Sequence, residues 1–173
     1  MNYIKLKEIS ILEKGIYGIS ASGSKFNKNY PEYLRITDID SFGNIPNKLP
    51  MSIDISIYPN WSNFLLKKND IVFARTGSVG KNYFCNVINR KIVFGGYLIK
   101  FSIDNSKIIP KYVSYYCKSN SYWKQLKKFY TASVMHNINE KQYENLLIPL
   151  IDIKNQKHIV NTIIHLFLFL KFL

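Results

Sequence analysis

Short stretches in which apolar and polar residues alternate dominate the first hundred residues, a pattern typical of β-strands with one buried face. Turn-forming glycine and asparagine residues separate these stretches, as at the Gly95-Gly96 pair. Residues 51–69 are ambiguous, although 52–58 could pair as a strand, and the Gly-, Ser-, Asn- and Lys-rich segment 15–30 predicts a loop. Strands are predicted at 33–37, 71–75, 83–88, 92–94 and 97–101.

In the last third of the chain, apolar residues instead recur at helical spacing. A helix is predicted over 110–129, because Pro110 suits a first helical turn. Asn139 can cap a short helix that ends near residue 145, and an extended segment follows at 146–150. Asp152 can cap a final helix.

These patterns predict an α+β fold, in which a mixed β-sheet packs against helices. Residues 1–150 would form one domain, and residues 151–173 one C-terminal helix of coiled-coil type. A length of 173 residues with 47% hydrophobic and 15% aromatic content is enough for one domain with a buried core, and it excludes intrinsic disorder.

The chain has no feature that predicts export or membrane insertion. Residues 1–10 are charged and do not form a signal peptide, and the longest apolar run, Leu166–Leu170, is far shorter than the roughly 20 residues of a membrane span. Cys85 and Cys117 are too few for a disulfide scaffold, although one bridge stays open. We expect a cytoplasmic protein with reduced thiols and no membrane partner.

Positive charge is concentrated in the middle of the chain. The formal net charge is +13, and residues 71–139 hold 11 of the 24 basic residues but only one acid, Asp104. Aromatic residues are interleaved with these basic residues, a combination that favours a nucleic acid as partner. A solvated basic face is the alternative, and composition alone does not decide between them.

Candidate catalytic motifs are incomplete. Two residues, not four, separate Gly77 from Gly80, and Asn82 follows Lys81, so the segment lacks the spacing of a phosphate-binding P-loop. Asp152-Ile153-Lys154 is a fragment seen in metal-dependent nucleases, but the acids near it, Glu140 and Glu144, fit a helix surface better. No His or Cys pair has zinc spacing. The sequence predicts a binding protein with no catalytic residues, metal or cofactor of its own.

Several segments, taken in order, carry a family resemblance. They are YLRITDI at 33–39, KNDIVFARTGSVGK at 68–81, GYLIKF at 96–101, PKYV at 110–113, NIN at 137–139, LIPL at 147–150 and QKHIV at 156–160. Each segment alone is weakly specific, but the ordered set, spread over about residues 1–165, resembles a target recognition domain of the specificity subunit of type I restriction–modification enzymes.

The resemblance implies a role without chemistry. In that family the specificity subunit reads double-stranded DNA and holds the methyltransferase and restriction subunits, which use the methyl donor, ATP and magnesium. A full subunit has two recognition domains separated by long helices. This chain would be a half-length or truncated form, with a target recognition domain at 1–150 and the start of the conserved helical segment at 151–173. Two copies would pair through that helix as a homodimer, although its apolar end departs from the family pattern.

The resemblance and the residue chemistry together indicate where DNA would bind. We expect Lys81 to contact a phosphate, and base contacts to come from the loop 17–29, from Arg35 and Thr37, and from the stretch 131–137. Ordinary turn chemistry is the alternative for any one of these residues. The DNA-binding candidates are Lys25, Arg35, Thr37, Arg75, Thr76, Ser78, Lys81, Ser133, His136 and Asn137.

Other interpretations stay open at this point. Instead of contacting DNA, Arg75 could be an internal partner of Asp70 or Asp38. A stand-alone nuclease would use Asp152 and Glu144, an RNA-binding module would use the aromatic residues, and an interaction protein would use only the apolar tail. The aromatic residues at 110–130 are expected in the core rather than on a base-stacking surface.

Overall fold

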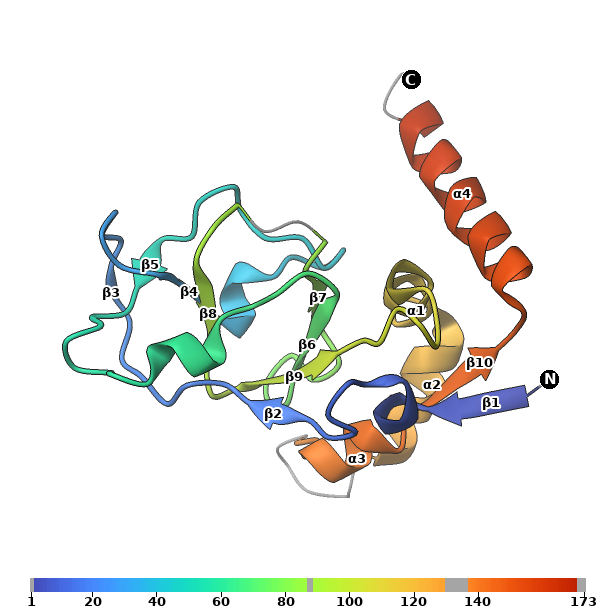
Figure 1. Cartoon of the computed structure of the whole chain (residues 1–173), viewed down its shortest axis with the longest axis horizontal. Coiled ribbons are helices and arrows are strands. Elements are labelled where there is room, and N and C mark those ends of the chain that lie inside the picture. The colour runs from blue at the N-terminus through green and yellow to red at the C-terminus, as the bar shows by residue number, and fades with distance from the viewer. Residues whose placement is uncertain (1, 87–88, 130–136, 171–173) are drawn as a thin grey trace.

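The structure, a computed structural model, describes residues 2–86, 89–129 and 137–170. The fold is α+β, as the sequence predicts (Figure 1). The strands are β1 (Asn2–Lys5), β2 (Ile16–Tyr17), β3 (Ser24–Lys25), β4 (Glu32–Leu34), β5 (Met51–Ser52), β6 (Asp70–Ala74), β7 (Asn82–Phe84), β8 (Ile92–Phe94), β9 (Leu98–Ser102) and β10 (Leu147–Leu150). The α-helices are α1 (Pro110–Tyr116), α2 (Asn120–Phe129), α3 (Glu140–Glu144) and α4 (Ile153–Leu170), and short 3-10 helices span Leu6–Ile9, Ile36–Asp38 and Trp61–Phe64.

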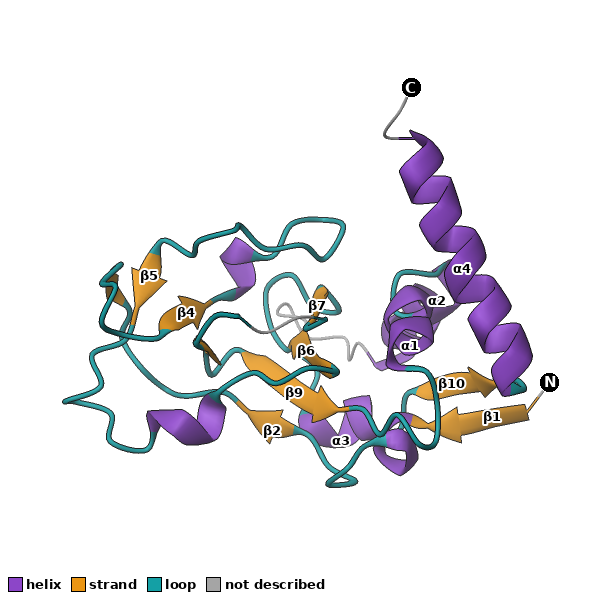
Figure 2. Ribbon diagram, turned by 45° about the horizontal axis from the view of Figure 1, so that its top comes forward, coloured by secondary structure: helices purple, strands orange, loops and turns teal. Residues whose placement is uncertain are grey.

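Within these ranges the strands form three sheets. The central sheet has the order β2-β9-β6-β7 and is antiparallel throughout. The second has the order β3-β5-β4-β8, in which β4 and β8 run parallel. The third pairs β1 with β10, and Figure 2 shows α1, α2 and α3 gathered at that end of the molecule.

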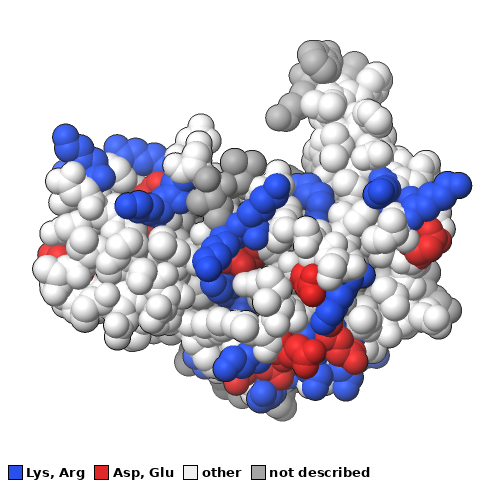
Figure 3. Space-filling view, viewed as in Figure 1, with Lys and Arg blue, Asp and Glu red and all other residues white. Residues whose placement is uncertain are grey.

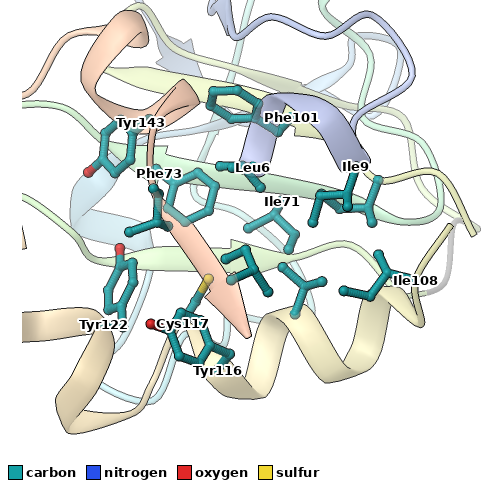
Figure 4. Close-up of a cluster of buried hydrophobic side chains, with 14 of the residues drawn as sticks. Leu6, Ile9, Ile71, Phe73, Phe101, Ile108, Tyr116, Cys117, Tyr122 and Tyr143 are labelled. Carbon is teal, nitrogen blue, oxygen red and sulfur yellow. The ribbon is translucent and has the colours of Figure 1, made fainter. Parts of the chain in front are cut away.

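Strand β6 lies at the centre of the core and is buried on both faces. Ile71 and Phe73 point into the cluster beneath the helices, whereas Val72 and Ala74 pack into the cluster shared with β4 and β8. Phe73 stacks on Tyr143 with a centroid distance of 4.9 Å. Figure 4 shows the two rings next to each other. Burial on both faces explains why the β6 segment is almost continuously apolar.

The predicted helix over 110–129 is wrong in one respect, because it divides into α1 and α2. The Asn82 side-chain amide donates to the Cys117 carbonyl at 3.0 Å, so that carbonyl is held by a strand residue. The Ser119 hydroxyl then accepts the Tyr122 N–H at 3.2 Å and starts α2. Tyr112 and Tyr122 are buried, which confirms the core role expected of most aromatic residues there.

Other boundaries differ from the sequence prediction. The strand predicted at 33–37 ends at Leu34, since Asp38 accepts the Arg35 N–H at 2.9 Å and closes a 3-10 turn. The predicted loop 15–30 contributes β2 and β3, and the possible strand at 52–58 adds only Ser52 to β5. Of the strand predicted at 83–88, Tyr83 and Phe84 lie in β7, residues 85–86 are not in a strand, and residues 87–88 lie outside the described residues. Two-residue strands carry too little sequence pattern to be recognised.

The caps of the last two helices are confirmed. The Asn139 side chain accepts the Gln142 N–H at 3.0 Å and the Gln142 side chain accepts the Asn139 N–H at 2.9 Å, a reciprocal capping box. Asp152 accepts the Asn155 N–H at 2.9 Å at the start of α4. The buried residues of helix α4 are Gln156 and Val160, and its later half projects from the molecule (Figure 1). Among the described residues, no helix combines the length and apolarity needed to cross a bilayer.

Both cysteines are free thiols, as expected, and both are buried. Burial raises the pKa of Cys117 to about 12 and that of Cys85 to about 11. The two thiols are therefore protonated and act as small apolar side chains in the core.

Candidate nucleic-acid interface

A hollow of about 630 Å³ opens where the chain leaves β4, β6 and β8. We call it the strand-end hollow. Four of the predicted DNA-binding residues line it, Arg35 and Thr37 after β4 and Thr76 and Ser78 after β6. The other lining residues are Ala21, Gly23, Tyr33, Ile36, Met51, Gly77, Gly95, Tyr97 and Leu98.

Strand register brings these separate segments together. Parallel pairing places Leu34 opposite Phe94, so the chain leaves β4 and β8 side by side, and the Gly95 N–H donates to the Leu34 carbonyl at 3.0 Å. The Arg75 N–H donates to the Tyr97 carbonyl at 3.0 Å and joins the end of β6 to the same turn. Residues more than forty positions apart in sequence therefore share one surface.

The floor of the strand-end hollow is apolar, and one exposed aromatic residue stands at its edge. Tyr33 is buried, and its hydroxyl donates to the Ala21 carbonyl at 3.0 Å. A Cβ on Gly95 would lie 2.7 Å from that hydroxyl, so the close packing here requires glycine. Tyr97 is 69% exposed beside this turn. Sequence reasoning missed it, although its position after Gly95-Gly96 marks an aromatic residue on a turn.

Arg35 is fixed at the rim by an ion pair with Asp38. Arg35 Nε donates to Asp38 Oδ2 at 3.0 Å and Nη2 donates to Oδ1 at 2.8 Å. The Asp38 side chain is 5% exposed and that of Arg35 is 39% exposed. The hydrogen bonds that Arg35 donates to Asp38 raise the pKa of the Arg35 guanidinium further above its usual range, so it is charged at every physiological pH.

Arg75 does not have the internal carboxylate partner that was the alternative for it. Asp38 binds Arg35, while Asp70 lies 3.5 Å from Lys100 Nζ and accepts the Ser102 hydroxyl at 2.6 Å. The Arg75 guanidinium instead lies over the Tyr17 ring, 4.8 Å from its centroid. Its buried Nε has no hydrogen-bond partner within the described part of the chain.

The stretch after α2 returns to the end of β6. Thr76 and Asn137 form an antiparallel bridge, and the Ile138 N–H donates to the Arg75 carbonyl at 2.8 Å. The structure thus places Asn137, which is exposed, beside Thr76. Ser133 and His136 lie outside the described residues.

Lys81 and Lys25 lie away from the strand-end hollow. Lys81 lines a separate hollow of about 330 Å³ together with Lys118 and Trp123, and Ser78 lines both hollows. Lys25 is exposed on β3, where its register partner is Met51 of the strand-end hollow. The ten predicted residues therefore do not form a single patch.

Part of the positive charge at 71–139 is neutralised inside the fold. Lys100 is buried beside Asp70, and Arg90 pairs with Glu32. On the face drawn in Figure 3 the basic side chains stand in separate groups, several with acidic side chains beside them. Concentration of charge along the sequence does not become one continuous basic block on this face.

The residues of the nuclease alternative have structural roles. Asp152 accepts two hydrogen bonds from Asn155 at the start of α4. Glu144 is buried and lies 3.1 Å from Lys141 Nζ, so its predicted place on a helix surface is wrong. Within 2–86, 89–129 and 137–170, no group of three or more His, Cys, Asp or Glu residues could hold a metal ion.

Comparison with known families identifies the class of protein to which this fold and site belong. Residues 1–168 match the model of the type I restriction modification DNA specificity domain, and the chain belongs to that family. The resemblance found in the sequence segments is thereby confirmed. No curated protein sequence matches the chain.

Solved structures with a similar fold include specificity subunits. The type I restriction–modification S subunit from M. genitalium is 18% identical, with a TM-score of 0.63 over 93% of this chain and 37% of that one. The HsdS subunit from Thermoanaerobacter tengcongensis is 16% identical, with a TM-score of 0.66 over 98% of this chain and 43% of that one.

A third similar chain comes from a type I R-M system whose structure addresses complex assembly and conformational transition. It is 16% identical, with a TM-score of 0.63 over 96% of this chain and 42% of that one. The present chain therefore spans about two fifths of the length of these relatives. At these identities the likeness concerns the fold.

Proposed function

We propose that this chain recognises a specific double-stranded DNA sequence as a specificity subunit, or half-subunit, of a cytoplasmic type I restriction–modification system. Residues 1–150 act as the target recognition domain and residues 151–173 begin the conserved helical segment. The chain does no chemistry itself and directs methyltransferase and restriction subunits. Family membership supports this role.

One observation carries the proposal beyond the family match. The strand-end hollow unites Arg35 and Thr37 with Thr76 and Ser78, all of them predicted from sequence to touch DNA. Its rim offers guanidinium and hydroxyl groups, which bond base edges and phosphates, while its floor is apolar enough to contact sugars and thymine methyl groups. Lys81 and Lys25 do not line it and suit contacts to phosphates beside it.

Selection of bound duplexes from a random DNA pool tests the proposal. The purified full chain, alone and with a type I methyltransferase subunit, should enrich one sequence motif. Competition with single-stranded RNA should leave that binding intact. Absence of any enriched duplex in both arms, or displacement by RNA, would contradict the proposed function in favour of the other binding classes.

We also propose that two copies pair through α4. Exposed apolar side chains cover its later half, namely Ile164, Leu166, Phe167, Leu168, Phe169 and Leu170. Burying such a surface against a second copy is favourable, and two copies would supply two recognition domains. Within the chain, α4 packs against α1, and the residues that α4 buries, Gln156 and Val160, lie in its first half.

A further inference from the structure

Two arginine–carboxylate pairs in the molecule have the same geometry but different surroundings. In each pair Nε and Nη2 of the arginine donate to the two oxygens of one carboxylate, Asp38 for Arg35 and Glu32 for Arg90. The third nitrogen of Arg90, Nη1, donates to the Pro46 carbonyl at 2.9 Å. Nη1 of Arg35 donates to no residue within the described part of the chain.

The Arg90 pair therefore has a structural role, whereas Nη1 of Arg35 has N–H groups that no described residue accepts. Asp38 is nearly buried and also accepts the Arg35 backbone N–H, so the carboxylate is fixed by the same turn that fixes the arginine. The guanidinium is rigid before any ligand arrives, and less conformational freedom is lost on binding. Because Arg35 lines the strand-end hollow, its remaining N–H groups are available to a ligand there.

The charge of the pair favours a base over a phosphate. Asp38 offsets most of the positive charge of Arg35, which weakens its attraction for phosphate groups. The directional N–H donors are retained, and arginine donors match the adjacent O6 and N7 acceptors of guanine in the major groove. Lysines such as Lys81, which has no ion-pair partner among the described residues, are better suited to phosphates.

We propose that Arg35 recognises a guanine of the DNA target, and that Asp38 is the positioning residue that holds the guanidinium for this contact. The inference rests on the proposed DNA-binding function. It assigns to Asp38, a residue with no predicted contact to DNA, a role in sequence selectivity.

The test uses the duplex motif selected by the full chain. Each guanine of the motif is changed to adenine, with its partner, and separately to 7-deazaguanine, which lacks the N7 acceptor. At one position we expect the base change to weaken binding by about fivefold to a hundredfold, and 7-deazaguanine by a part of that factor. Arg35→Lys should remove this sensitivity, because a lysine cannot bond two acceptors through a planar fork.

Asp38→Asn should reduce discrimination between bases at the same position of the motif and leave discrimination at the other positions unchanged. Loss of folding would instead weaken binding to every duplex. Glu32→Gln is the matched control, since it weakens the structural pair and should leave the base preference intact. Thermal unfolding of each variant identifies any that no longer folds. Arg35→Ala should leave the slope of log affinity against log salt unchanged.

The outcomes separate this inference from the proposed function. If no duplex is enriched, the proposed function fails and the inference fails with it. If a motif is enriched but contains no guanine sensitive to N7 removal, only the inference is overturned. A uniform loss of affinity in Arg35→Ala with a salt slope reduced by about one would instead assign Arg35 to a phosphate.

Discussion

Single residues decide the shape of the turn between β6 and β7. Gly77 has φ +63° and open space where a Cβ would lie, whereas Gly80 has φ +86° and a Cβ there would lie 2.3 Å from Leu126 Cδ1. Both glycines adopt a backbone conformation that other residues rarely adopt. Only Gly80 also allows α2 to approach the turn closely.

The two glycines should therefore differ in their response to alanine. Gly77→Ala should lower the free energy of unfolding by about 1 kcal/mol, the cost of a left-handed residue with a side chain. Gly80→Ala adds overpacking against Leu126 and Trp123, for a total of about 2–5 kcal/mol. Urea denaturation of both variants measures the difference, and equal losses would contradict the packing role of Gly80.

Lys81 follows this turn and should act as a phosphate contact. Lys81→Ala should weaken binding to all duplexes alike and reduce the salt slope by about one, because a phosphate contact carries no sequence information. Binding titrations over a range of salt concentrations measure both effects. Lys154→Ala, an exposed lysine of α4, is the control. A change of sequence preference in Lys81→Ala would instead place it at a base.

At the scale of elements, sequence pattern predicted the type of most elements but not where they end. Helical spacing of apolar residues continues across 117–119, where Ser119, a residue type common at helix starts, is a weak local sign of a break. The break arises because Asn82, far away in sequence, binds the Cys117 carbonyl. Strand β4 likewise ends early through the side chain of Asp38. Where a side-chain hydrogen bond ends an element, its boundary depends on which residues the fold brings into contact, and sequence pattern does not predict it.

Helix α4 exposes an apolar surface that a second copy of the chain would bury. Leu168, which is 50% exposed, lies within its apolar later half. We expect the wild-type chain to sediment as a dimer and Leu168→Glu to sediment as a monomer, since a charge buried in an apolar interface is strongly unfavourable. Asn161→Glu, also on an exposed position of α4, should leave the dimer intact. A wild-type monomer at micromolar concentration would contradict the pairing.

At the scale of the whole molecule, a long-range ion pair lies beside the parallel pairing of two strands. Arg90, just before β8, binds Glu32 at the start of β4, beside the parallel pairing of those strands. Burial alone would raise the pKa of Glu32, but the hydrogen bonds from Arg90 and from the Leu49 N–H, with the nearby positive charge, lower that pKa below its usual value. The ionised carboxylate is thus favoured by the fold.

This lowered pKa predicts how stability depends on pH. The contribution of Glu32 is fully present above its ordinary pKa and is lost as pH falls through the lowered folded-state value. The difference in melting temperature between wild type and Glu32→Gln should therefore be largest near neutral pH and shrink in acid. A difference that does not change with pH would show that the carboxylate charge has no part in stability.

Some features of the whole molecule could be predicted from the sequence, and others could not. The α+β class, the capped helices and the family followed from local pattern and ordered segments, because cap chemistry, periodicity and motif order are properties of neighbouring residues. The candidate residues Arg35, Thr37, Thr76 and Ser78 were also found from sequence. The sequence did not predict that these four residues line one hollow together with Tyr97. That arrangement depends on the register of β4 with β8.

The sequence by itself determined the composition of the core, the helical caps and the membership of the specificity family, since each depends on residue type and local spacing. Only the tertiary structure decided that Nη1 of Arg90 donates to a backbone carbonyl while Nη1 of Arg35 has no acceptor within the described part of the chain, although both are arginines with a carboxylate partner. The reason is geometric: a hydrogen-bonding group is free or occupied according to which distant backbone the fold brings within 3 Å of it.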